Sequence, residues 1–274
     1  MIEQFQWLST GYCTALERVA RRDGQFRHIQ FPAPFGVLHH RTQGIVLFDT
    51  GYSPRFFEAT RHFPYRMYRY ATPVFTRPEA SAKAQLERQQ IDPAEVRHIL
   101  LSHFHGDHVC GLRDFPNAQF YCHEEALEQL NTHTGFQAAR KGLLPDLFPA
   151  DFRERCHVFT ADNALPDPIF GSVWDVFGDG SITMPWLPGH GKGQIGARFD
   201  CAGQSWFLTA DAAWFAAAIR HNILPSALVR LFFDDWKAYQ QTLAKLQLYA
   251  SHHPTTRMIP SHCQDSFEQV QQNS

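Results

Sequence analysis

The 274-residue sequence has little lysine, no excess of positive charge and no long hydrophobic run. Charged residues make up 19% of the chain, below the ~25% that is usual for globular proteins, and the net charge is −2. Nucleic-acid binding domains are normally basic, so we expect no nucleic-acid partner. The longest uninterrupted apolar stretch, Ala212–Ile219, is far shorter than the ~20 residues that span a bilayer, so we expect no membrane partner.

Paired cysteines and an export signal are also missing. The six cysteines are scattered, with no CxxC pair, and in a chain of this length they do not form a recognisable disulfide framework. The first residues, MIEQFQWLST, lack a basic segment followed by an apolar one. These features predict a cytoplasmic protein.

What the chain does have is 44% hydrophobic residues and 16 histidines. This length and composition favour a single domain, residues 1–274, with a large core. Short β-rich segments alternate with segments that have helical spacing, which is typical of a layered α/β architecture. The expected strands are residues 44–49, 98–102, 120–122, 206–209 and 257–260, and the expected helices are 76–90, 123–131 and a helix that begins at residue 234 or 235.

The helix at residues 76–90 is predicted from its start. Thr76 and Glu79 have the spacing of a capping box, and Pro78 lies in the first turn. We therefore expect the side chain of Thr76 to cap this helix.

One short segment concentrates metal-binding chemistry. His103, His105, Asp107 and His108 lie within six residues, directly after an apolar strand. Imidazole and carboxylate are ligands that zinc and similar divalent metals accept. Alternation places His103 and His105 on the same side of an extended segment, and Gly106 permits the turn that redirects the next two ligands. Four ligands from one loop cannot close around a single ion, so the segment predicts two metals.

This segment resembles the HxHxDH signature of the metallo-β-lactamase fold superfamily. Four further segments are similar to its pattern, in the same order along the chain: Phe48-Asp49-Thr50-Gly51, Leu187-Pro188-Gly189-His190, Thr209-Ala210-Asp211-Ala212 and Ile259-Pro260-Ser261-His262. The resemblance runs from about residue 30 to residue 265. It implies an α/β fold, a four-layer αββα sandwich of the metallo-β-lactamase type.

The resemblance also implies a complete ligand set. The first metal would be held by His103, His105 and His190, and the second by Asp107, His108 and His262, with Asp211 bridging the two. Asp107 and Asp211 would then be the catalytic residues, with a hydroxide between the ions as nucleophile. Asp49 would lie behind the ligands and orient them, with a carboxylate that merely caps its turn as the less favoured alternative. The cofactors would be two divalent metal ions, zinc first, with manganese, iron or cobalt as alternatives.

Within the superfamily, the layout is closest to the N-acyl homoserine lactonase branch. The sequence departs from that branch at two places. His190 is not followed by a second Gly-His, and Trp214 stands where the branch tends to have a tyrosine that stabilises an oxyanion. The resemblance therefore implies a lactonase-like hydrolase without fixing the substrate.

An insertion at about residues 52–76 is rich in aromatic residues and arginine. We expect Phe56, Phe57 and Tyr68 from this insertion, together with Trp214, to line a pocket for an acyl or aryl group of a small-molecule substrate. A homodimer contact or ordinary packing would explain the same residues equally well.

The leading hypothesis is a dinuclear metal-dependent hydrolase that cleaves an ester or lactone. Aryl ester or phosphotriester hydrolysis at the same site is the nearest alternative. A metal-binding regulatory module without turnover and an iron-dependent oxidoreductase are alternatives of other classes.

Overall fold

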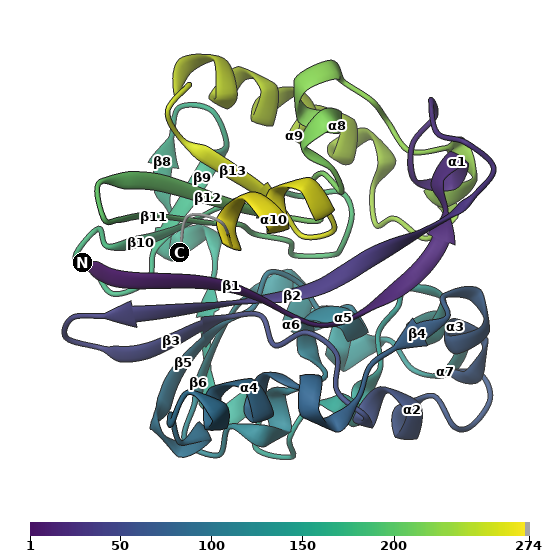
Figure 1. Ribbon diagram of the computed structural model, residues 1–274, viewed down its shortest axis with the longest axis horizontal. Coiled ribbons are helices and arrows are strands. Elements are labelled where there is room, and N and C mark those ends of the chain that lie inside the picture. Colours follow the sequence, from purple (N-terminus) through teal and green to yellow (C-terminus); the bar gives the residue numbers. More distant parts are fainter. Residues whose placement is uncertain (272–274) are drawn as a thin grey trace.

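The computed structural model describes residues 1–271. Two groups of strands lie face to face in the middle of the molecule, with helices outside both (Figure 1). The strands are β1 (Ile2–Leu16), β2 (His28–His40), β3 (Gly44–Phe48), β4 (Val74–Phe75), β5 (Val96–Leu100), β6 (Gln119–His123), β7 (Cys156–Phe159), β8 (Leu165–Asp167), β9 (Gly171–Asp175), β10 (Ile182–Pro185), β11 (Ala197–Cys201), β12 (Gln204–Ala210) and β13 (Arg257–Pro260).

The helices lie on the two outer faces. On one side are α2 (Arg55–Ala59), α3 (Arg66–Ala71), α4 (Ala82–Arg88), α5 (Gly106–Val109), α6 (Glu124–Thr132) and α7 (Gly135–Arg140). On the other are α8 (Ala216–His221), α9 (Trp236–His252) and α10 (Gln264–Gln271), while α1 (Glu17–Ala20) lies at the end of the long β1–β2 hairpin (Figure 1). No helix in residues 1–271 combines the length and apolar character that crossing a membrane requires.

Strand pairing links the two groups into one folded sheet. The order runs β7-β6-β5-β3-β2-β1-β11-β10-β9-β8, and β12 and β13 continue from β11. The link between the halves is the parallel pair Ile2 and Cys201 of β1 and β11. Parallel neighbours β3, β5 and β6 end at the same edge, so the loops that follow them lie together.

Alternation along the strands produces separate cores between the layers. In β3, Leu47 packs toward the helices with Val37 and Ile99, whereas Phe48 packs between the two halves of the sheet. On the C-terminal side Phe207 of β12 faces α8 and α9. Helices therefore cover both faces of a double sheet, which confirms the expected αββα sandwich.

The expected start of the helix near residue 76 is wrong. A short 3₁₀ turn covers Pro78–Ala80, and α4 begins only at Ala82, where the Ser81 hydroxyl accepts a hydrogen bond from the Ala84 amide at 3.3 Å. Thr76 is used elsewhere, because its hydroxyl donates to the Thr10 carbonyl at 2.7 Å and ties β4 to β1.

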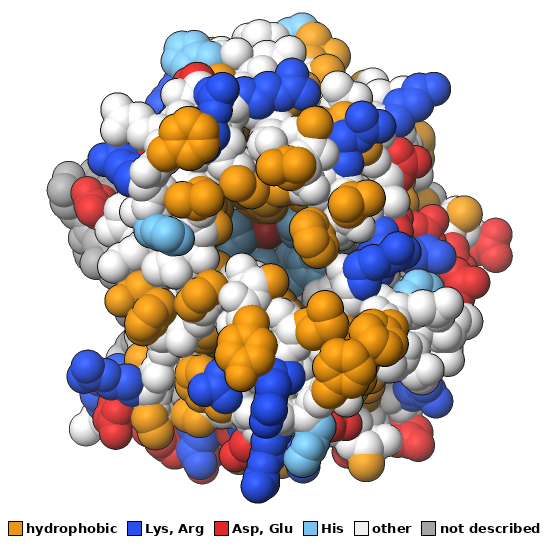
Figure 2. Space-filling model, turned by 90° about the vertical axis from the view of Figure 1, so that its right-hand side faces the viewer, with side chains coloured by type: hydrophobic (Ala, Val, Ile, Leu, Met, Phe, Trp, Pro, Cys, Tyr) orange, Lys and Arg blue, Asp and Glu red, His pale blue; other side chains and the backbone are white. Residues whose placement is uncertain are grey.

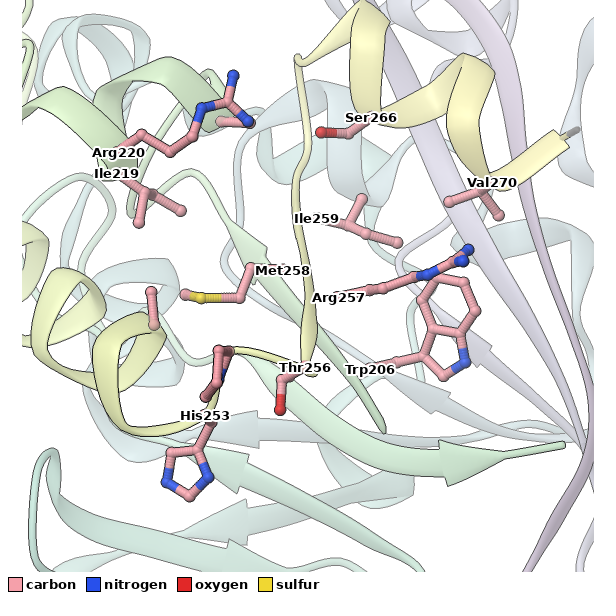
Figure 3. Close-up of a pocket in the computed structure, with 13 residues that line it drawn as sticks. Trp206, Ile219, Arg220, His253, Thr256, Arg257, Met258, Ile259, Ser266 and Val270 are labelled. Carbon is pink, nitrogen blue, oxygen red and sulfur yellow. The ribbon is translucent and has the colours of Figure 1, made fainter. Parts of the chain in front are cut away.

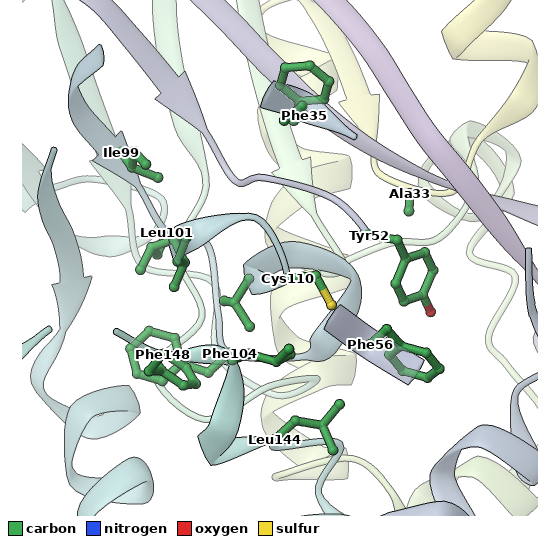
Figure 4. Packing of buried hydrophobic residues seen from close by; sticks show 14 of the residues in the cluster. Ala33, Phe35, Tyr52, Phe56, Ile99, Leu101, Phe104, Cys110, Leu144 and Phe148 are labelled. Carbon is green, nitrogen blue, oxygen red and sulfur yellow. The ribbon is translucent and has the colours of Figure 1, made fainter. Parts of the chain in front are cut away.

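The insertion folds as α2, α3 and β4, and part of it joins the core. Tyr52 and Phe56 are buried among core side chains that include Cys110 and Leu144 (Figure 4). Phe56 has no exposed surface, which contradicts its expected place on the wall of an open pocket. The physical reason is that the buried face of the five-residue helix α2 carries Phe56 inward.

Candidate metal centre

Each of the sequence-predicted ligands follows the end of a strand. The segment 103–108 comes after β5, and His190, Asp211 and His262 come after β10, β12 and β13. All of these side chains are buried except His105, which is half-buried. The structure thus brings four separate loops to one edge of the double sheet.

Three imidazoles converge on one point. His105 Nδ1 lies 2.9 Å from His103 Nε2 and 3.0 Å from His190 Nε2. The turn that presents His190 depends on Gly189, which has φ +130°, and a Cβ there would lie 2.2 Å from the Tyr239 backbone nitrogen. Only glycine allows this approach of the loop to α9.

A second group forms beside the first. Asp107 Oδ2 lies 3.7 Å from His108 Nε2 and 3.6 Å from His262 Nε2. In this group, as in the first, the ligand atoms lie within 4.8 Å of one another.

Asp211 lies between the two groups. Its Oδ2 is 3.2 Å from His190 Nε2 and 2.9 Å from His262 Nε2, while its Oδ1 is 3.5 Å from His108 Nε2. One carboxylate therefore contacts histidines of both groups, as a ligand shared by two ions would.

Hydrogen bonds on the far side of the rings fix which nitrogens face the cluster. Asp49 Oδ2 accepts from His108 Nδ1 at 2.7 Å and from the Ser102 hydroxyl at 2.7 Å, and Asp49 Oδ1 accepts from the Ser102 amide at 2.8 Å. His262 Nδ1 donates to the Pro32 carbonyl at 2.8 Å. With Nδ1 occupied, His108 and His262 present Nε2 to the cluster, which is how outer hydrogen bonds orient metal-binding histidines.

The electrostatics favour a cation at this place. Burial holds the pKa of His103 and His105 well below its usual value, so both rings are neutral and carry free lone pairs. Burial opposes ionisation of Asp211, but His262, His108 and His190 outweigh it and hold the carboxyl pKa well below its usual range.

Buried polar atoms without hydrogen-bond partners also indicate a place for a cation. His108 Nε2 and Asp211 Oδ1 are buried and make no hydrogen bond within the protein. An unsatisfied buried polar atom costs about 1–3 kcal/mol. A cation that binds the lone pairs of this nitrogen and this oxygen would remove that cost. Imidazoles plus carboxylates form a donor set that suits borderline divalent metals, and the residues fit such ions.

Comparison with known families matches the pattern described as Metallo-beta-lactamase superfamily to residues 35–250. The chain belongs to the metallo-β-lactamase superfamily. The matched range holds the segment 103–108, His190 and Asp211, whereas His262 lies beyond it.

Two relatives and one solved structure are similar to this member of the superfamily. N-acyl homoserine lactonase AttM of Rhizobium radiobacter is 27% identical over 184 residues, 67% of this chain and 64% of that protein. AttM of Azorhizobium caulinodans is 25% identical over 223 residues, 78% of this chain and 77% of that protein. The chain thus spans a little less than two thirds of the length of the first relative.

The solved structure is an N-acyl homoserine lactone hydrolase with the product N-hexanoyl-L-homoserine bound at its catalytic metal center. It has a TM-score of 0.75 at 15% identity and covers 98% of this chain and 96% of that chain. At this identity the likeness concerns the fold.

Trp214 does not present a free donor to the site. Its indole Nε1 donates to Asp211 Oδ2 at 3.1 Å, and its ring packs edge-on against Phe31, His190 and Phe233. Phe233 also packs edge-on against His190, with ring centroids 4.7 Å apart. This residue belongs to the apolar stretch near residues 228–233, but no local pattern indicated that it contacts a ligand.

The face that carries the metal centre is hollowed (Figure 2). Histidine and acidic side chains lie at the bottom of the hollow, and hydrophobic side chains border it. Among the expected pocket residues, Phe57 and Tyr68 are half-buried, and the Arg69 guanidinium lies 4.8 Å from the Phe57 ring centroid. Met67 and Tyr70, on the same helix as Tyr68, expose more than half of their surface, as does Leu231.

A cavity of about 570 Å³ reaches the centre from another direction. It borders His262 and is lined by Arg21, Arg27 and His28 of the β1–β2 hairpin end and by Phe215. The sequence pattern did not indicate this wall, because its residues come from segments without a motif.

A second cavity of about 470 Å³ lies outside the centre, between α8, β13 and α10 (Figure 3). Trp206, Met258 and Ile259 form its apolar floor, and none of the seven predicted ligands lines it.

Proposed function

We propose that this chain is a dinuclear metal-dependent hydrolase that opens lactones or cleaves related esters. The observation that supports this most strongly is Asp211, whose two oxygens reach histidines of both groups. The lactonase names of the relatives favour the lactone, although the match to the first of them covers 64% of its length.

In this proposal each group of side chains holds one ion. His103, His105 and His190 would hold the first, and Asp107, His108 and His262 the second, with Asp211 shared. Two divalent ions, with zinc as the first choice and manganese, iron or cobalt as alternatives, would supply a hydroxide nucleophile at neutral pH and polarise the substrate carbonyl.

The protein's own residues orient this chemistry. Asp49 fixes the His108 ring from behind, and the Pro32 carbonyl does the same for His262. Asp107 is a ligand at the edge of the buried set, with its side chain 10% exposed, so it can pass a proton to the leaving alcohol. The hydrophobic border of the hollow excludes water and receives the acyl or aryl part of the substrate.

Aryl ester or phosphotriester hydrolysis is a second candidate. The observation that favours it is the half-buried Trp214, whose ring packs edge-on against His190 with centroids 5.7 Å apart. A flat ring of the substrate can stack against this indole, whereas Phe31 and Phe233 are buried.

A turnover screen of the metal-loaded protein tests both candidates. Lactones, aryl esters, thioesters and phosphotriesters are incubated with the protein and analysed by mass spectrometry, with protein stripped by a chelator as control. We expect lactone opening that disappears on chelation and returns with zinc. Silence across the panel would contradict the proposal and favour a metal-binding module without turnover. Retention of activity after complete metal removal would contradict the metal mechanism.

The remaining proposals concern assembly. We propose one domain over residues 1–274 and a homodimer formed through the insertion at residues 52–76. Light scattering on the purified protein measures the mass directly. A monomer at all concentrations tested would contradict the dimer.

A further inference from the structure

The hydrolysis of an ester or lactone builds negative charge on the carbonyl oxygen, and a hydrogen-bond donor aimed at that oxygen accelerates the reaction. Near this centre the Trp214 indole is the obvious candidate. Its N–H already donates to Asp211 Oδ2 at 3.1 Å, so it is not free for a substrate.

Three tyrosines come close to the acidic groups of the centre. The hydroxyls of Tyr52 and Tyr239 are buried and make no hydrogen bond, and both residues are only 1% exposed, so no substrate atom can reach them. Tyr68 differs, because it is half-buried and its hydroxyl makes no hydrogen bond with any described residue. It is the one of the three whose side chain keeps exposed surface.

The ring of Tyr68 lies against the ligand segment. A Cβ at Gly106, the residue between His105 and Asp107, would be 3.5 Å from Tyr68 Cε1. This carbon is next to the one that bears the hydroxyl, so the polar end of the ring lies near the ligands. The buried ring of Phe56 meets Tyr68 edge-on, with centroids 5.4 Å apart and planes at 83°, and holds it from behind.

The electrostatic environment is consistent with this position. Burial, followed by the negative charge of Asp107, raises the pKa of Tyr68 well above its usual value, and Asp211 adds to the effect. A phenol at its ordinary pKa of about 10 is protonated at neutral pH, so Tyr68 can act as a donor.

We propose that the Tyr68 hydroxyl donates a hydrogen bond to the carbonyl oxygen of the bound substrate and makes Tyr68 a catalytic residue from the insertion. The inference rests on the proposed ester or lactone hydrolysis. In this proposal the buried Phe56 acts indirectly, through its packing against the Tyr68 ring.

Tyr68→Phe tests the inference, because it removes only the hydroxyl. Tyr70→Phe is the matched control: Tyr70 lies on the same helix and is 73% exposed. We expect Tyr68→Phe to lower kcat by about 100-fold, because one donor to a developing oxyanion is lost. KM should change much less, metal content should stay unchanged, and Tyr70→Phe should match the wild type.

A binding measurement supplies a readout that does not depend on turnover. A γ-lactam analogue of the substrate keeps the carbonyl oxygen and resists opening, and calorimetry gives its Kd. We expect the Tyr68→Phe protein to bind the lactam about tenfold more weakly, the loss of one good hydrogen bond.

The outcomes separate the two proposals. If the wild type opens lactones and Tyr68→Phe keeps its kcat and lactam Kd, the inference alone is overturned. It is also overturned if Tyr68→Phe loses metal, because the effect would then be structural. If the wild type binds the lactam but opens no lactone, the proposed function fails and the Kd comparison decides the inference. If it does neither, both fail.

Discussion

The metal centre and the insertion at residues 52–76 meet at one hollow but are built in opposite ways. In the centre, side chains are buried and the rings of His108 and His262 are each oriented by a hydrogen bond on the outer nitrogen. In the insertion, Met67 and Tyr70 expose more than half of their surface, and α3 buries no residue completely. Under the proposed function, the buried strand ends would set the chemistry, while the more exposed insertion would influence the choice of substrate.

The largest predicted effect comes from removing predicted metal ligands at the metal centre. His105→Ala and Asp211→Ala each remove a side chain that the proposal assigns as a metal ligand. We expect both to lower kcat/KM by about 1,000-fold or more, because the nucleophile depends on the ions. Steady-state kinetics measures this, with the exposed His252→Ala as control. Activity within tenfold of the wild type would remove these residues from the mechanism.

Asp49→Asn is a milder change at the metal centre. The substitution replaces the carboxylate that accepts hydrogen bonds from His108 and Ser102 with an amide. The His108 ring is then less firmly oriented, while all predicted ligands are kept. We expect a 10- to 100-fold loss of metal affinity or activity, which chelator competition and kinetics measure. The exposed Asp162→Asn serves as control. An unchanged Asp49→Asn protein would favour a carboxylate that merely caps its turn.

Substitution of an exposed hydrophobic residue should change the choice of substrate and leave the metal content unchanged. Leu231 is 72% exposed and lies two residues before Phe233, whose ring contacts His190, whereas Leu165 is 53% exposed on β8. We expect Leu231→Asp to raise KM for long-chain acyl lactones by about 3- to 10-fold, since the burial of one or two methylene groups would be lost, at about 0.8 kcal/mol each. Leu165→Asp should change nothing. Equal effects on short and long acyl chains would show that this residue does not contact the chain.

The smallest predicted effect concerns histidines without carboxylate partners. Burial, with smaller contributions from the nearby His157 and His40, lowers the pKa of His98 to about 4. The carboxylates around His108, in contrast, outweigh burial and raise its pKa. Because the folded pKa of His98 lies below its unfolded value near 6.5, its stabilising contribution is complete above pH 6.5. The contribution is lost as the pH falls from 6.5 toward 4.

Thermal melting of the metal-free protein between pH 8 and pH 5 measures this loss. We expect His98→Phe to flatten the decline of Tm over that range by a few degrees. A parallel decline in the wild type and the variant would mean that His98 does not contribute.

The same contrast explains what the sequence could predict. The segment 103–108 was predictable from its residue types and from the apolar strand before it, whereas Asp211 and His262 were predicted only through the resemblance to the superfamily pattern. Their role as metal ligands stays a prediction. The start of α4 was not predictable, since Thr76 and Ser81 are both acceptable caps and only the contact of Thr76 with Thr10 decides between them.

The direction of the side chains expected to contact substrate could not be predicted from the sequence. Nothing in the local sequence pattern indicates that Phe56 is buried in the core while Tyr68 stays half-buried. The engagement of the Trp214 indole by Asp211 likewise depends on how two loops meet. The cavity beside His262 is formed by the β1–β2 hairpin end, which carries no motif.

The central claim is that Asp211 joins two metal sites. Elemental analysis by mass spectrometry of protein purified without chelator tests it most directly, with wild type and Asp211→Ala measured side by side. The account predicts about two divalent ions per chain in the wild type and a clear loss in the variant. A wild type with no bound metal, or a variant that keeps both ions, would contradict it.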